Sequence, residues 1–203
     1  MRRRFSNVSG FVLAGGASRR MGRPKHLLQF GGEILLVHQL NLLHRLCRSV
    51  TIVASPENIS STGVPEFAAV DDRIPHCGPL GGIHTGLAIT RTEYNLFLGC
   101  DLPLMETRFL RFLCNRALSA DADVTVPIDE QCMYQPLCAV YRRRARAVIR
   151  ASILRGDYKV THVFRHVACQ AIDWREMSDM GFNSRLFTNV NTPEDFEAAV
   201  GGQ

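Results

Sequence analysis

The chain of 203 residues lacks any long hydrophobic run. Its apolar stretches, such as residues 34–37 and 96–98, are far shorter than the ~20 residues that a membrane-spanning helix needs. Three of the first five residues are arginines, as at the start of a signal peptide, but polar residues between 6 and 10 interrupt the apolar segment that would have to follow. We therefore expect a cytoplasmic protein that does not contact a membrane.

The chain also lacks any C-x-x-C pair. Its seven cysteines, an odd number, are scattered between positions 47 and 169. This argues against a disulfide framework and against a zinc cluster, so we expect reduced and mostly structural thiols. With 46% hydrophobic and 21% charged residues, the composition is that of an ordinary globular chain, and no linker or repeat divides it. A single domain over residues 1–203 is expected.

Lysine is scarce. Of the 24 basic residues only Lys25 and Lys159 are lysines, and the formal net charge is +5. The arginines are dispersed except for one dense run, residues 142–146, which we interpret as the exposed face of a helix start rather than a nucleic-acid patch. We expect no nucleic-acid partner.

Apolar runs of strand length alternate with runs of helical periodicity, which indicates an α/β fold with a mostly parallel sheet covered by helices. The expected strands cover residues 10–14, 50–54, 67–70, 95–99, 123–127, 136–141 and 168–173. The expected helices cover residues 36–47, 109–118 and 143–154, a short stretch after Gly156, and a last helix opened by Thr192-Pro193-Glu194. Residues 79–90 are expected to form a loop that enters a further helix.

A glycine-rich segment follows the first strand. Gly15 and Gly16 would let the backbone approach a ligand, while Arg19, Arg20 and Lys25 supply charge for phosphates. The segment fits neither the Walker A pattern nor G-x-G-x-x-G, so ordinary ATPases and dinucleotide dehydrogenases lose support. A plain turn after a strand remains the alternative.

Two further strand ends carry acidic residues. In an open α/β sheet, ligands bind beyond the carboxyl ends of the strands. Asp101 follows an apolar strand and could hold Mg²⁺ against phosphate oxygens, although a structural turn at residues 100–103 is the alternative. Asp71 and Asp72 end another strand before the glycine-rich turn at residues 78–82, which could equally be a plain tight turn.

In combination, these segments resemble the molybdenum cofactor guanylyltransferases. The resemblance covers residues 11–200 in order, and its motifs are specific only together. They are Leu13-Ala14-Gly15-Gly16-x-Ser18-x-Arg20-Met21-Gly22-x-x-Lys25, Gly78-Pro79-Leu80-x-Gly82, Cys100-Asp101-x-Pro103 and Asn189-Val190-Asn191-Thr192-Pro193-Glu194-Asp195.

The resemblance implies a Rossmann-like, three-layer nucleotidyltransferase fold. It also implies transfer of GMP from GTP to the phosphate of molybdopterin with Mg²⁺, and transient contact with other cofactor-biosynthesis proteins or acceptor molybdoenzymes. By position, three residues would line the guanine nucleotide: Leu13, Ala14 and Gly15. Lys25 would meet the phosphates, Asp71 would face the nucleotide, and Asp101 would ligate Mg²⁺. Asn191 is a second metal-ligand candidate, by a looser analogy with wider nucleotidyltransferases.

Two positions depart from the family pattern. Pro24 stands where the family usually has aspartate, as in the related cytidylyltransferases, and Ala54-Ser55 replace an asparagine that often contacts the nucleotide. Cytidylyl transfer to the same pterin, or to another phosphorylated acceptor, therefore stays open, as does a non-catalytic nucleotide-binding adaptor. Acceptor binding is expected in the less regular second half of the chain, where Gln135, Arg142 and Lys159 are only weak candidates.

Overall fold

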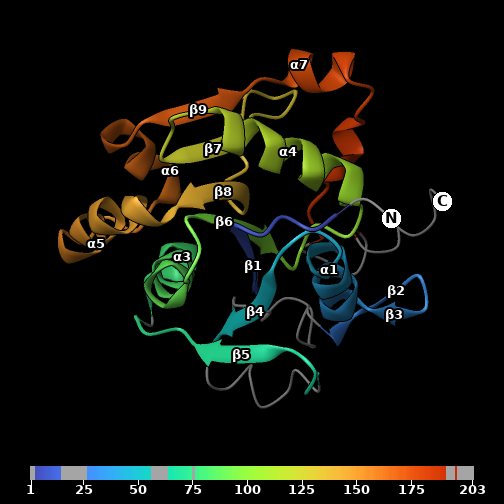
Figure 1. Cartoon of the computed structure of the whole chain (residues 1–203), viewed down its shortest axis with the longest axis horizontal. Coiled ribbons are helices and arrows are strands. Elements are labelled where there is room, and N and C mark those ends of the chain that lie inside the picture. The colour runs from blue at the N-terminus through green and yellow to red at the C-terminus, as the bar shows by residue number, and fades with distance from the viewer. Residues whose placement is uncertain (1–2, 15–26, 56–63, 75, 191–194, 196–203) are drawn as a thin grey trace.

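The computed structural model describes residues 3–14, 27–55, 64–74, 76–190 and 195. Its centre is a seven-stranded sheet, which runs from one edge strand at the bottom of Figure 1 to the other at the top. The strands in spatial order are β5 (Ala68–Asp71), β4 (Ser49–Ala54), β1 (Val8–Leu13), β6 (Tyr94–Gly99), β8 (Cys138–Arg142), β7 (Val124–Pro127) and β9 (Cys169–Ile172).

The sheet is mostly parallel, as predicted. β5, β4, β1 and β6 pair in parallel, and so do β7 and β9. Of the strands described, only β8 runs antiparallel to its neighbours in this sheet. The carboxyl ends of the other six strands therefore meet at one edge, together with the amino end of β8.

Helices cover both faces of the sheet (Figure 1). On one face lie α1 (Leu35–His44) and α4 (Thr107–Ser119), and on the other lie α3 (Gly78–Ile89), α5 (Arg146–Leu154) and α6 (Val160–Val163). A further helix, α7 (Trp174–Asp179), follows β9, and three 3₁₀ turns complete the second half: η2 (Arg143–Ala145), η3 (Phe164–His166) and η4 (Ser184–Phe187). Within the described residues, no helix is long and apolar enough to cross a bilayer.

Each face of the sheet has its own hydrophobic core, which explains why the central strands read as continuous apolar runs rather than alternating ones. All six residues of β1 are buried. On the α3 face, the rings of Phe11 and Phe97 stack with centroids 4.9 Å apart, and Tyr141 meets Phe97 edge-on at 5.5 Å. Helix α3 passes this stack at Gly86, where a Cβ atom would lie 2.7 Å from the Phe97 ring.

The predicted strands are all present, with bounds that shift by one or two residues, and the short helix expected after Gly156 is α6. Among the strands and α-helices, three short elements were missed: the hairpin β2 (Gln29–Phe30) with β3 (Glu33–Ile34), and α7. The sequence did hold a signal for α7, because the Asp173 side chain caps the helix by accepting a 2.8 Å hydrogen bond from the Glu176 amide.

Two predicted helices differ in detail. Helix α1 ends at His44, so Cys47 lies beyond it. On α4 the last buried residue is Ala117, whereas Leu118 is exposed. The prediction that Leu118 belongs to the buried face of this helix was therefore wrong. The helix expected to open at Thr192-Pro193-Glu194 lies outside the described residues.

The interpretation of the arginine run as a solvated helix face was wrong for its first residue, Arg142. Arg142 is the last residue of β8 and pairs with Glu93 at 2.9 Å and with Asp121 at 2.6 Å, while Arg144 pairs with Asp121 and Asp123. Helix α5 begins only at Arg146. Because β8 is antiparallel, Arg142 lies at the edge of the sheet opposite to the carboxyl ends of the parallel strands, which also argues against Arg142 as an acceptor contact.

Candidate functional site

Four strand ends form one row at the carboxyl edge of the sheet. The register pairs Leu13 with Val53 on one side and with Gly99 on the other, and it pairs Val53 with Val70. The row extends by one residue, because the amide of Ala14 donates to the Val53 carbonyl at 3.0 Å and the amide of Cys100 donates to the Leu13 carbonyl at 3.3 Å. The structure thus brings Leu13, Ala14, Asp71 and Asp101 to the same edge, as the sequence predicted.

These residues differ in exposure. Leu13 and Ala14 are buried, with 8% and 3% of their surface exposed, so a ligand would meet chiefly their backbone. Asp101 is half-buried and Asp71 is exposed. Gly15 and Lys25, which complete the predicted nucleotide contacts, lie outside the described residues, as does Asn191.

The turn that carries Asp101 is fixed from two sides. The Asp101 carbonyl accepts a 2.9 Å hydrogen bond from the Val190 amide, and the Leu102 carbonyl accepts one of 2.6 Å from the side chain of Gln39 on α1. Gln39 is fully buried. Sequence analysis missed this contact, although a polar residue on the apolar face of a helix was a usable signal.

The Asp101 carboxylate depends on a glycine two positions earlier. A Cβ atom on Gly99 would lie 2.5 Å from Oδ1 of Asp101 and 3.3 Å from the Cβ atom of Leu137. Glycine at position 99 therefore leaves room for the carboxylate to fold back across the end of β6. The residue on its other flank, Leu137, comes from the loop before β8 and was not foreseen.

A magnesium ion fits this site only if its substrate supplies ligands too. In the described part of the chain, no group of three or more His, Cys, Asp or Glu side chains could hold a metal. Mg²⁺ is commonly bound through one or two carboxylates together with substrate phosphates and water, and Asp101 offers one such carboxylate. The donor set therefore suits a cation bridged to phosphates rather than one enclosed by protein.

Asp71 and Asp72 occupy different environments at the end of β5. Asp72 accepts hydrogen bonds from the Thr85 hydroxyl at 3.0 Å and from the Ile74 amide at 3.1 Å, so its carboxylate secures the loop to α3. Asp71 points from the end of an edge strand and is exposed. Along the row of strand ends, Asp71 is three interstrand spacings of ~4.8 Å away from Cys100, a distance of roughly 14 Å. Asp71 and Asp101 therefore do not share one cation.

The glycine-rich segment after β5 is not the turn that was expected. Helix α3 already begins at Gly78, whose φ is +58°, and Pro79 occupies its first turn. A Cβ atom on Gly81 would lie 2.6 Å from the Ile74 carbonyl oxygen, and one on Gly82 would lie 3.1 Å from the Leu13 side chain. These glycines let α3 pack directly against the strand end that carries the predicted nucleotide contacts.

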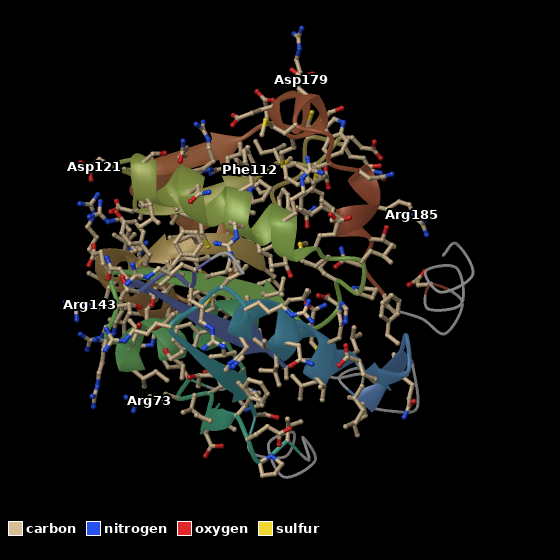
Figure 2. All side chains as sticks on the ribbon, turned by 45° about the vertical axis from the view of Figure 1, so that its right-hand side comes forward. Arg73, Phe112, Asp121, Arg143, Asp179 and Arg185 are labelled. Carbon is tan, nitrogen blue, oxygen red and sulfur yellow. The ribbon has the colours of Figure 1, made fainter. Side chains whose placement is uncertain are left out.

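A cavity of about 340 Å³ adjoins the Asp101 turn on the α1 and α4 face. The Arg185 side chain, at one rim, extends away from the ribbon (Figure 2). On another wall, Nδ1 of His38 lies 3.0 Å from the carboxylate of Glu33. The cavity is lined by Phe30, His38, Pro103, Leu104, Met105, Glu106, Asn183, Arg185 and Leu186.

The comparisons with known proteins agree with this geometry. The family model described as MobA-like NTP transferase domain matches residues 10–171. A "Molybdenum cofactor guanylyltransferase" of Syntrophotalea carbinolica is 33% identical over 93% of this chain and 89% of its own length. A "Probable molybdenum cofactor guanylyltransferase" of Carboxydothermus hydrogenoformans is 30% identical over 95% of both chains.

Solved structures share the fold. The Archaeoglobus fulgidus molybdopterin-guanine dinucleotide biosynthesis protein A superposes with a TM-score of 0.82, at 22% identity, over 95% of this chain and 97% of that one. The 4-diphosphocytidyl-2C-methyl-D-erythritol synthase of Anaerococcus prevotii gives 0.68 at 13% identity, over 97% and 96%. At these identities the likeness speaks for the fold alone, and it confirms the predicted nucleotidyltransferase architecture.

Proposed function

Because the chain belongs to the MobA-like NTP transferase family, we propose that it transfers GMP from GTP to the terminal phosphate of molybdopterin, forming the guanine dinucleotide cofactor and pyrophosphate. The proposal is carried by the named relatives, which align over nearly the whole chain. An aspartate just beyond the carboxyl end of β6 is consistent with it. GTP and molybdopterin are then the substrates.

The reaction requires little covalent chemistry from the side chains of the protein. A phosphate oxygen of the acceptor attacks the α-phosphorus of GTP, a new P–O bond forms, and the bond to the leaving pyrophosphate breaks in line. The acceptor phosphate is ionised at neutral pH, so no general base is required. What the chain must do is bind two anionic molecules, align them and neutralise their charge.

Named residues divide this work. The backbone at Leu13, Ala14 and Gly15 would contact the guanine nucleotide, Asp71 would face its far end, and Lys25 would pair with its phosphates. Asp101 would hold Mg²⁺, with Asn191 as a second ligand. When bound there, Mg²⁺ supplies positive charge that offsets the charge developing on the phosphates.

The preference for guanine rests on Gly15. The resemblance links Leu-Ala-Gly-Gly to guanylyl enzymes and Leu-Ala-Ala-Gly to cytidylyl ones, and a backbone without Cβ at position 15 leaves room for a purine. Pro24 favours the cytidylyl alternative, but it adjoins the phosphate-binding Lys25, where all nucleotides are alike. We give Gly15 the greater weight.

The decisive experiment offers the protein GTP and CTP at equal concentration with molybdopterin and Mg²⁺, and identifies the dinucleotide formed. At least tenfold preference for GTP in kcat/KM is expected, a difference of ~1.4 kcal/mol. Mostly cytosine dinucleotide would refute the guanylyl assignment, and release of no pyrophosphate would favour a non-catalytic adaptor. Asp101→Asn serves as the control for contaminating activity.

The proposal extends to cellular setting. We place the reaction in the cytoplasm, and we expect transient contact with other cofactor-biosynthesis proteins or with the molybdoenzymes that receive the product. Cross-linking in an extract that contains an apo-molybdoenzyme, with and without GTP, would test this contact.

A further inference from the structure

Exposed apolar side chains gather beside the carboxyl edge of the sheet. Of the six large hydrophobic side chains that are exposed in the described part of the chain, three belong to two segments there. Met133 and Tyr134, 60% and 37% exposed, lie in the loop between β7 and β8, and Tyr158, 45% exposed, lies between α5 and α6. Exposed aromatic rings that lie together beside the proposed nucleotide site are suited to contact a flat ligand.

The two segments are packed together. The Tyr134 ring meets the Phe164 ring edge-on with centroids 5.2 Å apart, and Phe164 begins η3, which continues α6. Tyr158 precedes α6 by two residues, and its side chain lies near the thiol of Cys77, the residue before α3. Cys77 and Phe164 belong to the same buried cluster. The two tyrosines therefore flank one short helical stretch, next to the start of α3.

This surface borders the Asp101 carboxylate. The loop that carries Tyr134 ends at Leu137, whose carbonyl accepts a 2.7 Å hydrogen bond from the Gly99 amide. Leu137 also flanks the space above Gly99 into which the Asp101 carboxylate folds. Tyr134 and Leu137 are three positions apart, so their Cα atoms are separated by at most ~11 Å. A ligand of two or three fused rings can rest on Tyr134 while its side arm reaches Asp101.

The loop holds Tyr134 in place before any ligand arrives. Oδ1 of Asp129 accepts 2.9 Å hydrogen bonds from the amides of Gln131 and Met133, and Oδ2 accepts one of 2.7 Å from the side chain of Gln135. The amide of Asp129 in turn donates to the Met133 carbonyl at 3.0 Å. Because Asp129 is satisfied by its own loop, its charge is not directed at a ligand. A fixed exposed ring loses little entropy on binding.

A lysine adds positive charge to this surface. Lys159 is exposed, and within the described residues its ammonium group has neither a hydrogen bond nor an ion pair; only its backbone amide is used, donating to Asp157 at 3.4 Å. Asp157 is itself engaged by His162 at 3.0 Å. Lys159 thus remains available to an anionic ligand, in a chain that has only one other lysine, Lys25.

We infer that Tyr134, Tyr158 and Lys159 form the acceptor site, in which the tyrosines stack against the planar pterin and Lys159 pairs with the acceptor's negative charge. This inference rests on the proposed function and adds to it the residues that bind the second substrate. Guanine offers a similar flat ring, so the experiment must separate pterin from nucleotide. Asp71 lies at the end of β5, on the opposite side of the sheet from the loop between β7 and β8 that carries Tyr134, so the proposed nucleotide contact of Asp71 is separate from Tyr134.

The test uses a stable pterin that carries a terminal phosphate, neopterin monophosphate, and follows the quenching of its fluorescence as the full-length protein is added. Tyr134→Ala, Tyr158→Ala and Lys159→Ala should each weaken probe binding at least tenfold and raise KM for molybdopterin, while KM for GTP stays within twofold. Lys159→Arg should restore most of the affinity. Leu118→Ala on α4 and Arg175→Ala on α7 are the controls, since both residues are exposed on other elements, and they should change nothing.

Unchanged probe binding in both tyrosine variants would overturn the inference, and so would a parallel loss of GTP binding, which would assign these rings to guanine. Loss of the probe on Glu106→Ala alone would move the pterin to the cavity beside Pro103. If Tyr134→Ala does not fold, Tyr134→Leu keeps the apolar contact with Phe164 without the flat ring and should show the same loss. Failure of the proposed function is distinct: wild-type protein would bind the probe but form no guanine dinucleotide.

Discussion

The Asp72 carboxylate accepts a 3.0 Å hydrogen bond from the hydroxyl of Thr85, a residue that is completely buried on α3. Two neighbouring aspartates at the end of β5 thereby acquire separate tasks. Asp72 joins the loop to the helix, and Asp71 remains exposed at the carboxyl edge.

Replacing each aspartate by alanine should separate these tasks. Asp72→Ala leaves the buried Thr85 hydroxyl without its acceptor and should lower the free energy of unfolding by roughly 2 kcal/mol in urea titrations. Asp71→Ala should change stability by less than about 0.5 kcal/mol, as for most surface substitutions, but should raise KM for GTP. A strongly destabilised Asp71→Ala would contradict the division.

Gly99→Ala should impair catalysis more than stability. The new methyl group would lie 2.5 Å from Oδ1 of Asp101, so the carboxylate must rotate away from its position. We expect at least a tenfold loss in kcat, equivalent to ~1.4 kcal/mol. Gly86→Ala is the matched control, because its methyl group would press on the Phe97 ring instead. It should lower the melting temperature without a selective loss of turnover.

Asp101→Asn should abolish Mg²⁺-dependent turnover and leave the fold intact. The amide keeps the size of the side chain and loses the charge that holds a hard cation, while the backbone hydrogen bond to Val190 is unaffected. Pyrophosphate release at increasing Mg²⁺ concentration and a thermal melt measure the two effects. Normal turnover at low Mg²⁺, or an unfolded variant, would instead favour a purely structural turn at residues 100–103.

Lys25→Ala should cost at least ~2 kcal/mol in transition-state stabilisation, as expected when one charged donor is removed from a preorganised site. The measure is kcat/KM for GTP. Lys25→Arg, which retains the charge, is the natural comparison in a chain that prefers arginine. A change of less than threefold in the alanine variant would remove Lys25 from the mechanism.

His84 should make the protein less stable in acid. Neither ring nitrogen has a hydrogen-bond partner in the described structure. Burial lowers the pKa of His84, as do the charges of Arg146 and Arg150; Asp72 has a smaller opposing effect, and Arg73 lowers the pKa least. The unfolded chain, with a histidine pKa of ~6.5, then binds a proton more readily than the folded one, so stability falls as pH drops below that value.

The check is the pH dependence of the free energy of unfolding. His84→Leu removes the group and should flatten the decline in the free energy of unfolding between about pH 7 and pH 5. His166→Leu, at an exposed position, should leave the slope as in the wild type. Equal slopes in all three proteins would mean that His84 does not carry the acid sensitivity.

Local patterns in the sequence were enough to predict the central strands and the positions of Leu13, Ala14, Asp71 and Asp101 at their ends. Each strand and its end can be recognised from a short apolar run and the residue that follows it. The ends then lie together because parallel strands in one sheet all end at the same edge. The predicted roles of these residues, and of Gly15, Lys25 and Asn191 outside the described part, stay predictions that the variants above address.

The tertiary structure alone decided which side chains surround those strand ends. The antiparallel direction of β8 sends Arg142 to the far edge and brings Leu137 against Gly99. The packing of α3 engages Asp72 and leaves Asp71 exposed. The contact between Tyr134 and Phe164 joins segments thirty residues apart. All of these depend on strand direction, register and helix packing, which arise from pairings between distant residues and leave no trace in the local periodicity of the chain.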